Sequence, residues 1–354
     1  MLLQKLANYI SIDACGNGAE HTINLAGDGM NRRFAIASML AGAGTAIVPR
    51  IARAQAKFPE RPIRIIVPVS PGGGVDTFAR LIAAKIGEQR KVEFVVENRT
   101  GGNGIIAALD VQRAAPDGYA VLFHASTQNV ARLVMRDVPY DPLTDFTPIA
   151  LAGEAPLIHI IANNRPEKTV KEIVAAATAK PDDWSFATAQ LGAPGHLAEV
   201  AFNQYTKLNV PIVAYRGTAP AANDVAGGHV PMMIEAILSL LPLVKGGSVR
   251  AIALTGKKRS ALAPDVPTMT ELGLPQLDFG AWWAMWGPPA MPITLVKTLN
   301  GWVNDAVASL AAAGRLEALG IEPAARSPEE FAQYLRIDLD RSEKLLRAAS
   351  FTPQ

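Results

Sequence analysis

The stretch that decides the fold is residues 63–85, which read IRIIVPVSPGGGVDTFARLIAAK. Its first part is apolar and β-branched, as in a buried strand, and it runs into three consecutive glycines. Beyond Asp76, apolar residues such as Phe78 and Ile82 recur at helical spacing. We therefore predict a strand, a Gly-rich turn and a helix, the repeating unit of an α/β protein.

The same alternation continues outward from this stretch. We predict further strands over 92–96, 119–123, 157–162, 184–187, 210–214, 230–234, 251–255 and 282–286. We predict further helices over 107–114, 170–179, 195–205, 220–226 and 292–310. A second unit after Pro148 repeats the pattern of the first. This order predicts two doubly wound α/β lobes joined by a hinge, with lobe 1 over 57–156 and 279–354 and lobe 2 over 157–278.

Composition narrows the class of protein. The chain has 354 residues, 49% hydrophobic and 19% charged, which suits a packed globular protein with two domains. The net charge of +2, without a basic cluster, argues against a nucleic-acid partner.

Residues 30–56 have the features of a secretory signal peptide. Arg32 and Arg33 precede an apolar run over 34–48, and small-x-small triplets end at Ala54 and Ala56. The apolar run is shorter than the roughly 20 residues that span a bilayer. We expect cleavage near Ala54 or Ala56 and a periplasmic mature protein; the Arg pair leaves the export route, general secretory or twin-arginine, open.

Residues 1–29 resemble neither a signal peptide nor a domain. We interpret them as a non-native upstream extension that arises from a start codon assigned too early. Cys15, the single cysteine of the sequence, lies in this extension. The mature chain is therefore expected to have no disulfide and no cysteine-based metal site.

Two Gly-containing loops are the candidate binding elements. In the first, Gly72 and Gly73 join a strand to a helix, where backbone N–H groups can approach an anion at the positive helix end. We expect Gly73 to adopt a positive φ and to approach a ligand carboxylate; a simple tight turn is the alternative. The second loop, TAQLGAPGH over 188–196, repeats the arrangement of strand, polar loop and helix start.

Three further patterns in the sequence bear on the type of site. GNGIIA over 102–107 fits a dinucleotide fingerprint, but no acidic residue follows at the expected distance of about 20 residues. The His residues lack metal-ligand spacing, so no metal is expected. An exported hydrolase of small carboxylic esters or amides, using His196, is the alternative function, although no G-x-S-x-G elbow is present.

Several strings in the chain resemble the Bug-type receptors of tripartite tricarboxylate transporters. They are FPERPI at 58–63, PGGGVD at 71–76, ENR at 97–99, APDGY at 115–119, YDP at 140–142, YRGTAP at 215–220 and PDVPT at 264–268. The resemblance runs from about Phe58 to the C-terminus. It implies a periplasmic-binding-protein-like fold whose lobes close over a small organic carboxylate, without catalysis and without a cofactor.

The resemblance also implies which residues contact the solute, through backbone N–H groups and ordered water. The implied contacts are Gly72, Gly73, Thr77, Ser126, Thr127, Thr188, Gln190, Gly192, His196, Tyr215, Arg216 and Gly217. A monomer that serves a membrane permease or a sensor protein is expected.

Overall fold

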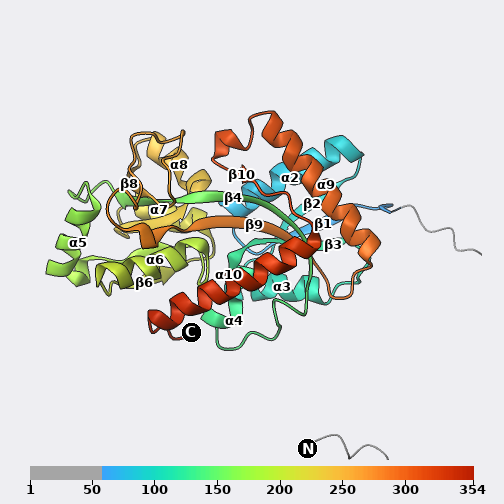
Figure 1. Cartoon of the computed structure of the whole chain (residues 1–354), viewed down its shortest axis with the longest axis horizontal. Coiled ribbons are helices and arrows are strands. Elements are labelled where there is room, and N and C mark those ends of the chain that lie inside the picture. The colour runs from blue at the N-terminus through green and yellow to red at the C-terminus, as the bar shows by residue number, and fades with distance from the viewer. Residues whose placement is uncertain (1–57) are drawn as a thin grey trace, which may run out of the picture. The chain divides into compact units, whose positions relative to one another are not determined.

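One curled, mixed sheet of ten strands organises residues 58–354, which are the residues that the computed structural model describes (Figure 1). The strand order is β2-β1-β3-β9-β4-β7-β5-β6, and β8 and β10 (Glu322–Pro323) also pair with β4. Helices pack on the sheet, so the α/β class is confirmed. The predicted signal peptide and upstream extension lie outside the described residues.

Lobe 1 is built on three parallel strands at one end of the sheet. They are β1 (Ile63–Val67), β2 (Phe94–Asn98) and β3 (Ala120–Ala125), with helices α2 (Gly74–Arg90), α3 (Ile105–Gln112) and α9 (Ile293–Ala312) around them. Strand β1 pairs in parallel with both neighbours. The apolar face predicted for α2 is the buried one, because Phe78 and Ile82 are fully inaccessible to solvent.

Lobe 2 repeats this plan at the other end of the sheet. Its strands are β5 (Phe186–Thr188), β6 (Ile212–Ala214), β7 (Met232–Ala236) and β8 (Val249–Leu254). Its helices are α5 (Val170–Ala179), α6 (Pro194–Thr206), α7 (Thr218–Ala226) and α8 (Ile237–Lys245). Strand β5 pairs in parallel with β6 and β7, as in a doubly wound unit.

Two long strands connect the lobes. The first part of β4 (Thr147–Ala162) pairs antiparallel with β9 (Gly280–Gly287), and its last part pairs with β7 and β8. The sequence predicted only 157–162 of β4, because Pro148 and Pro156 read as strand breakers. Register shifts after Pro148 and Leu151 interrupt the pairing with β9, so the strand continues despite its prolines.

The C-terminal helix α10 (Pro328–Ala348) crosses from one lobe to the other and was not predicted (Figure 1). It begins at a capping box formed by Ser327 and Glu330. Near its start, Phe331 packs against Trp282 and Trp286 of β9; near its end, Leu346 joins an apolar cluster with residues of α6. The helix therefore bridges both lobes beside the connecting strands.

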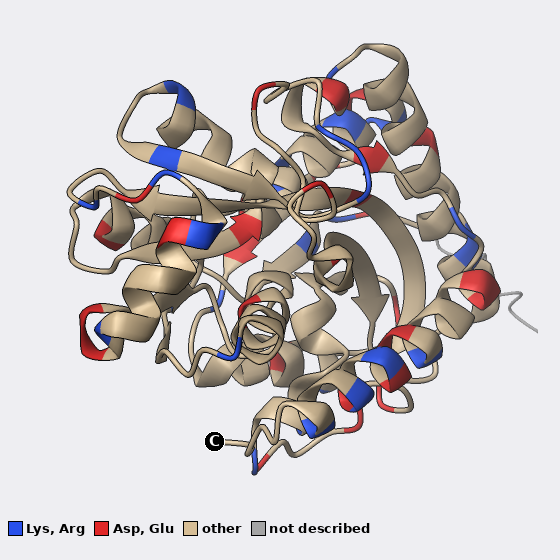
Figure 2. Ribbon diagram, turned by 60° about the vertical axis from the view of Figure 1, so that its left-hand side comes forward, with Lys and Arg blue, Asp and Glu red and all other residues tan. Residues whose placement is uncertain are grey.

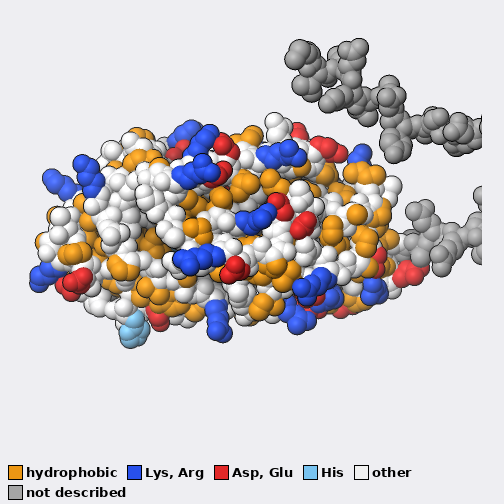
Figure 3. Space-filling view, turned by 90° about the horizontal axis from the view of Figure 1, so that it is seen from below, with side chains coloured by type: hydrophobic (Ala, Val, Ile, Leu, Met, Phe, Trp, Pro, Cys, Tyr) orange, Lys and Arg blue, Asp and Glu red, His pale blue; other side chains and the backbone are white. Residues whose placement is uncertain are grey.

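Lys, Arg, Asp and Glu residues lie mainly on helices and loops (Figure 2). On the face seen in Figure 3, cationic and anionic side chains are interspersed with hydrophobic ones. Within residues 58–354, no helix combines the length and the apolar character needed to cross a membrane.

Candidate functional site

Two concave regions lie beside the connecting strands. Successive side chains of a strand point to opposite faces, so Trp282 and Trp283 of β9 face different spaces. A groove of about 920 Å³ lies on the Trp282 side, and a cavity of about 20 Å³ lies on the Trp283 side. The groove is the larger of the two, but the residues that line each region determine which one suits a solute.

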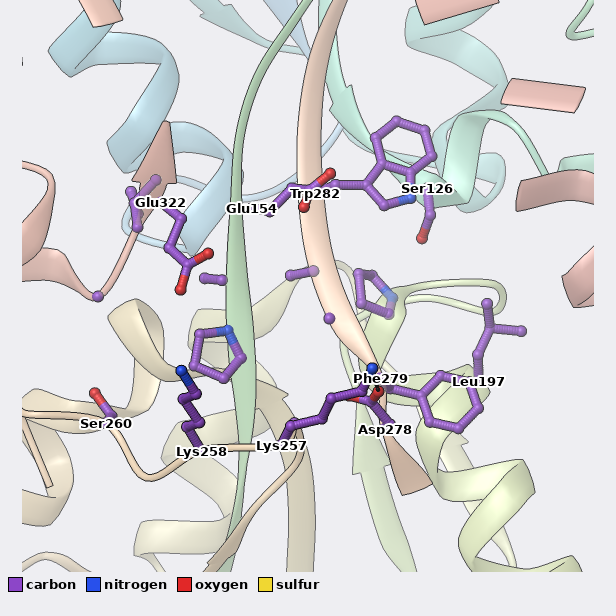
Figure 4. Close-up of a pocket in the computed structure, with 18 of the residues that line it drawn as sticks. Ser126, Glu154, Leu197, Lys257, Lys258, Ser260, Asp278, Phe279, Trp282 and Glu322 are labelled. Carbon is purple, nitrogen blue, oxygen red and sulfur yellow. Dashed lines mark ion pairs between the residues drawn. The ribbon is translucent and has the colours of Figure 1, made fainter. Parts of the chain in front are cut away.

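The groove is open and carries charges of both signs. Figure 4 shows Trp282 of β9 beside Glu154 of β4, with Lys257 and Lys258 of lobe 2 on another side. Lys257 is 3.8 Å from Asp278 and largely solvated. Of the predicted contacts, Ser126 alone lines this groove. The groove therefore lacks the arrangement predicted for solute binding.

Four helices begin at the wall of the small cavity. Lining residues include Gly74 at the start of α2, Pro194 at the start of α6, Thr218 at the start of α7 and Ala236 just before α8. First-turn N–H groups have no carbonyl partner within their helix, and the helix dipole is positive at this end. No Lys or Arg is among the described lining residues. The cavity is therefore suited to an anion held by backbone dipoles.

Polar side chains from both lobes also reach the cavity. Thr127 and His124 come from lobe 1, and Gln190, Glu235 and Ser239 come from lobe 2. Burial lowers the pKa of His124 to about 3, so its imidazole is neutral at physiological pH. The cavity therefore offers hydrogen bonds to a solute but no cationic side chain.

The carboxylate of Asp76, in the first turn of α2, holds the glycine loop of lobe 1 in place. Gly72 donates its N–H to Asp76 Oδ2 at 3.0 Å, and Asp76 also accepts from Arg80 at 3.0 Å and from Asn98 at 2.9 Å. Burial acts to raise the pKa of Asp76, but these hydrogen bonds outweigh burial and hold the pKa below its usual value. The ionised Asp76 thus orders the loop.

The backbone of Gly73 differs from the prediction. Its φ is −79° and its ψ is 171°, an extended conformation open to any residue, whereas Gly72 has a φ of +86°. The expectation of a positive φ at Gly73 is therefore wrong, and the left-handed turn falls one residue earlier. A Cβ at Gly73 would lie 3.5 Å from Thr218 Cβ across the cleft, an ordinary van der Waals contact.

A histidine fixes the glycine loop of lobe 2. Gly192 donates its N–H to His196 Nδ1 at 3.1 Å, and the His196 ring lies edge-on to Phe351 at 5.3 Å. Burial lowers the pKa of His196 to about 4. This neutral imidazole has its Nδ1 lone pair engaged, so it is not arranged as the base of a hydrolase.

Direct hydrogen bonds join the lobes across the cleft. Arg216 O accepts from Ser70 N at 3.1 Å and from Ser70 Oγ at 2.9 Å. Asn103 pairs reciprocally with the backbone of Leu191, with both distances 2.9 Å. The turn over 102–104, which resembles part of a dinucleotide fingerprint, thus places Asn103 against the other lobe. Because these hydrogen bonds join the two lobes directly, we describe the structure as a closed form.

Comparison with known proteins decides the family. Residues 78–351 match the family described as the tripartite tricarboxylate transporter family receptor. This chain belongs to that family.

Three solved structures share the fold of this receptor. Rpa4515 of R. palustris, solved with adipate, is 31% identical with a TM-score of 0.81, and the match covers 84% of this chain and 100% of that one. The periplasmic binding protein BugD is 31% identical with a TM-score of 0.80 over the same shares. MatC from Rhodopseudomonas palustris with bound malate is 31% identical with a TM-score of 0.78, covering 82% and 100%.

These matches confirm the predicted family and the periplasmic-binding-protein-like fold. The family and its structural neighbours are solute-binding receptors, not enzymes. The chain is accordingly a receptor of this family, and the hydrolase alternative is set aside.

The closed receptor brings only some of the predicted contacts to the cavity. Thr127 and Gln190 line it, and Gly73 immediately precedes the lining residue Gly74. The N–H groups of Gly72 and Gly192 are engaged inside their own loops.

The remaining predicted contacts lie farther from the cavity lining. Thr188 is buried, and its carbonyl accepts from the N–H of Tyr215 at 2.9 Å. The Tyr215 hydroxyl donates to Asp224 at 2.6 Å, the Arg216 side chain is exposed, and Gly217 donates its N–H to Ala189 O at 3.0 Å. Thr77 is half-buried in the first turn of α2.

Sequence reasoning missed several residues of the closed cleft. They are Asn103, His124, Thr218, Glu235 and Ser239. The sequence did contain one signal for this site, because Glu235 and Ser239 both follow the end of a predicted strand, where α/β proteins place their ligands. The helix that follows that strand was not predicted, because Pro242 interrupts its apolar run.

Proposed function

We propose that this receptor binds a small organic mono- or dicarboxylate between its lobes and delivers it to a membrane permease or a sensor protein. The observation that carries this proposal is the meeting of four helix starts at a cleft whose described lining has no Lys or Arg. Rpa4515 with adipate and MatC with malate support the same solute class. We further propose that the receptor acts as a monomer.

The proposed solute contacts are those implied by the family resemblance, together with the helix starts. They are Gly72, Gly73, Thr77, Ser126, Thr127, Thr188, Gln190, Gly192, His196, Tyr215, Arg216 and Gly217. The cavity of about 20 Å³ holds about one water-sized group. A bound acid would therefore hold the lobes slightly farther apart than in this closed form.

A thermal-shift screen of mono- and dicarboxylates, including adipate and malate, tests the solute class. A cognate acid at 100 times its dissociation constant should stabilise the folded receptor by about 2.7 kcal/mol, because it binds only the folded state. Neutral amides of the same acids serve as controls and should have no effect, since they carry no charge for the helix starts to stabilise. A flat response across the acids would refute the proposal.

We also propose that the receptor is exported to the periplasm and that a signal peptide over 30–56 is removed. The apolar run and the small-x-small triplets of the sequence support this proposal. N-terminal sequencing of periplasmic receptor should give Gln55 or Lys57 as the first residue. Recovery of residues 1–29 in that material would contradict both the cleavage and the early start codon.

A further inference from the structure

Glu235 places a carboxyl group on the wall of the proposed solute cleft. It lies in β7 directly before the start of α8, and it is only 5% exposed. Its Oε1 accepts the N–H of Ala236 at 2.8 Å. Of the described residues that line the cavity, Glu235 is the one carboxylic acid. An acidic side chain here faces the space that the proposed function gives to an anion.

Two carboxylates in this space would repel each other. The described lining has no Lys or Arg to separate the two charges, and burial reduces screening by solvent. A carboxyl group that shares a site with another carboxylate relieves the repulsion by keeping a proton. The protonated form then has an O–H group that can donate to the solute.

We propose that Glu235 takes up one proton from solvent when the receptor binds its carboxylate, and that the resulting carboxylic acid donates a hydrogen bond to the solute. This inference rests on the proposed function. It adds that the receptor binds its anion together with a proton and recognises the carboxylate partly through a neutral acid.

Proton uptake by Glu235 requires that no nearby cation neutralises its charge. The ionisable groups on the elements packed against β7 are Glu199, His196 and Tyr205 on α6, Glu154 and His159 on β4, Asp224 on α7, and Lys245 at the far, exposed end of α8. Across the cavity lie His124 on β3 and Asp76 with Arg80 on α2. Burial keeps the three histidines neutral, with pKa values of about 3 to 4. Arg80 is paired with Asp76.

Glu199 is a second buried carboxyl group beside Glu235. It is fully buried on α6, and its Oε1 accepts the N–H of Ile234, next to Glu235, at 3.1 Å. Burial raises the pKa of Glu199 well above its usual value, and the charge of Glu235 raises it further. Burial also raises the pKa of Glu235 to about 7. Both carboxyl groups thus take up a proton more readily than an ordinary glutamate does.

The pH dependence follows from this pKa. A bound anion raises the pKa of Glu235 further, so binding is coupled to proton uptake above the free value of about 7. Affinity should be full below pH 7 and should fall about tenfold per pH unit above it, until the pKa of the bound form is reached. An ordinary solute carboxylate is already ionised throughout this range.

Calorimetric titration at pH 8 in HEPES and in Tris tests the inference, because the two buffers differ in ionisation enthalpy. The probes are malate, adipate and the acid that gives the largest thermal shift. For the wild-type receptor we expect uptake of about one proton per solute bound. Glu235→Gln should bind without proton uptake and with constant affinity from pH 6 to 9. Glu322→Gln, a change of an exposed carboxylate at the groove, should behave like the wild type.

The possible outcomes separate the inference from the proposed function. Binding by the wild type without proton uptake overturns the role of Glu235 and leaves the receptor function intact. Failure of every acid to bind overturns both. If Glu235→Gln does not fold, the proton uptake of the wild type decides alone.

Discussion

Gly74→Val should weaken solute binding at least tenfold while leaving the stability of the solute-free receptor almost unchanged. A Cβ on Gly74 would lie 2.7 Å from Ser239 Oγ and 3.4 Å from Leu238 Cδ2. Gly74 belongs to α2 of lobe 1, and the other two residues belong to α8 of lobe 2. Valine carries two methyl groups beyond this Cβ, so its side chain still meets α8 when a solute holds the lobes slightly apart, and only an open form relieves the contact.

The expected size follows from the cost of overpacking. Extra methyl groups at a filled contact typically cost about 1–3 kcal/mol, and about 1.4 kcal/mol corresponds to a tenfold change in affinity. The open form avoids this cost by keeping the lobes apart. Gly74 is the first residue of α2 and lacks a positive φ, so valine fits the backbone there.

Calorimetric titration, paired with the urea midpoint of the solute-free protein, measures both effects. Gly301→Val is the matched control, because Gly301 also lies in a helix, α9, and a Cβ there would meet nothing within 4 Å. We expect this control to bind with wild-type affinity. Full affinity in Gly74→Val would show that solute binding does not require the closed cleft.

Gly195→Ala should have the opposite effect and destabilise the fold itself. A Cβ on Gly195 would lie 2.0 Å from Ile234 O, a backbone atom of β7. Both residues belong to lobe 2, where α6 packs on β7, so opening of the cleft cannot relieve the clash. We expect unfolding to become easier by about 3 kcal/mol or more, at the upper end of overpacking costs.

Urea denaturation of the solute-free variant measures this loss. Gly301→Ala is the control, and it should gain up to about 1 kcal/mol because alanine replaces glycine within a helix. A wild-type midpoint for Gly195→Ala would mean that α6 and β7 are packed less closely than in this structure.

The sequence predicted those parts of the fold that depend on local patterns. The strand, glycine loop and helix at 63–85 follow from periodicity, and the predicted helix over 170–179 agrees with α5 at both ends. Helix α10 was missed, although the capping box of Ser327 and Glu330 marks its start. The first part of β4 was missed because its prolines argue against a strand unless register shifts are known.

The candidate site was harder to predict because it is a property of the tertiary structure. The meeting of four helix starts depends on how the lobes close, and no local pattern contains that information. The role of Asn103 depends on Leu191, which is 88 residues away in the sequence. Likewise, the sequence does not show that the carboxyl group of Glu235 lines the same cavity as the four helix starts. Local patterns thus located the glycine loops but not their partners across the cleft.

A crystal structure of the receptor grown with its best-binding carboxylate tests the central claim most directly. We predict the solute on the Trp283 side of the connecting strands, with its carboxylate oxygens within hydrogen-bond distance of first-turn N–H groups of the helices that begin there. A solute bound instead in the groove beside Trp282 and Glu154 would contradict the account.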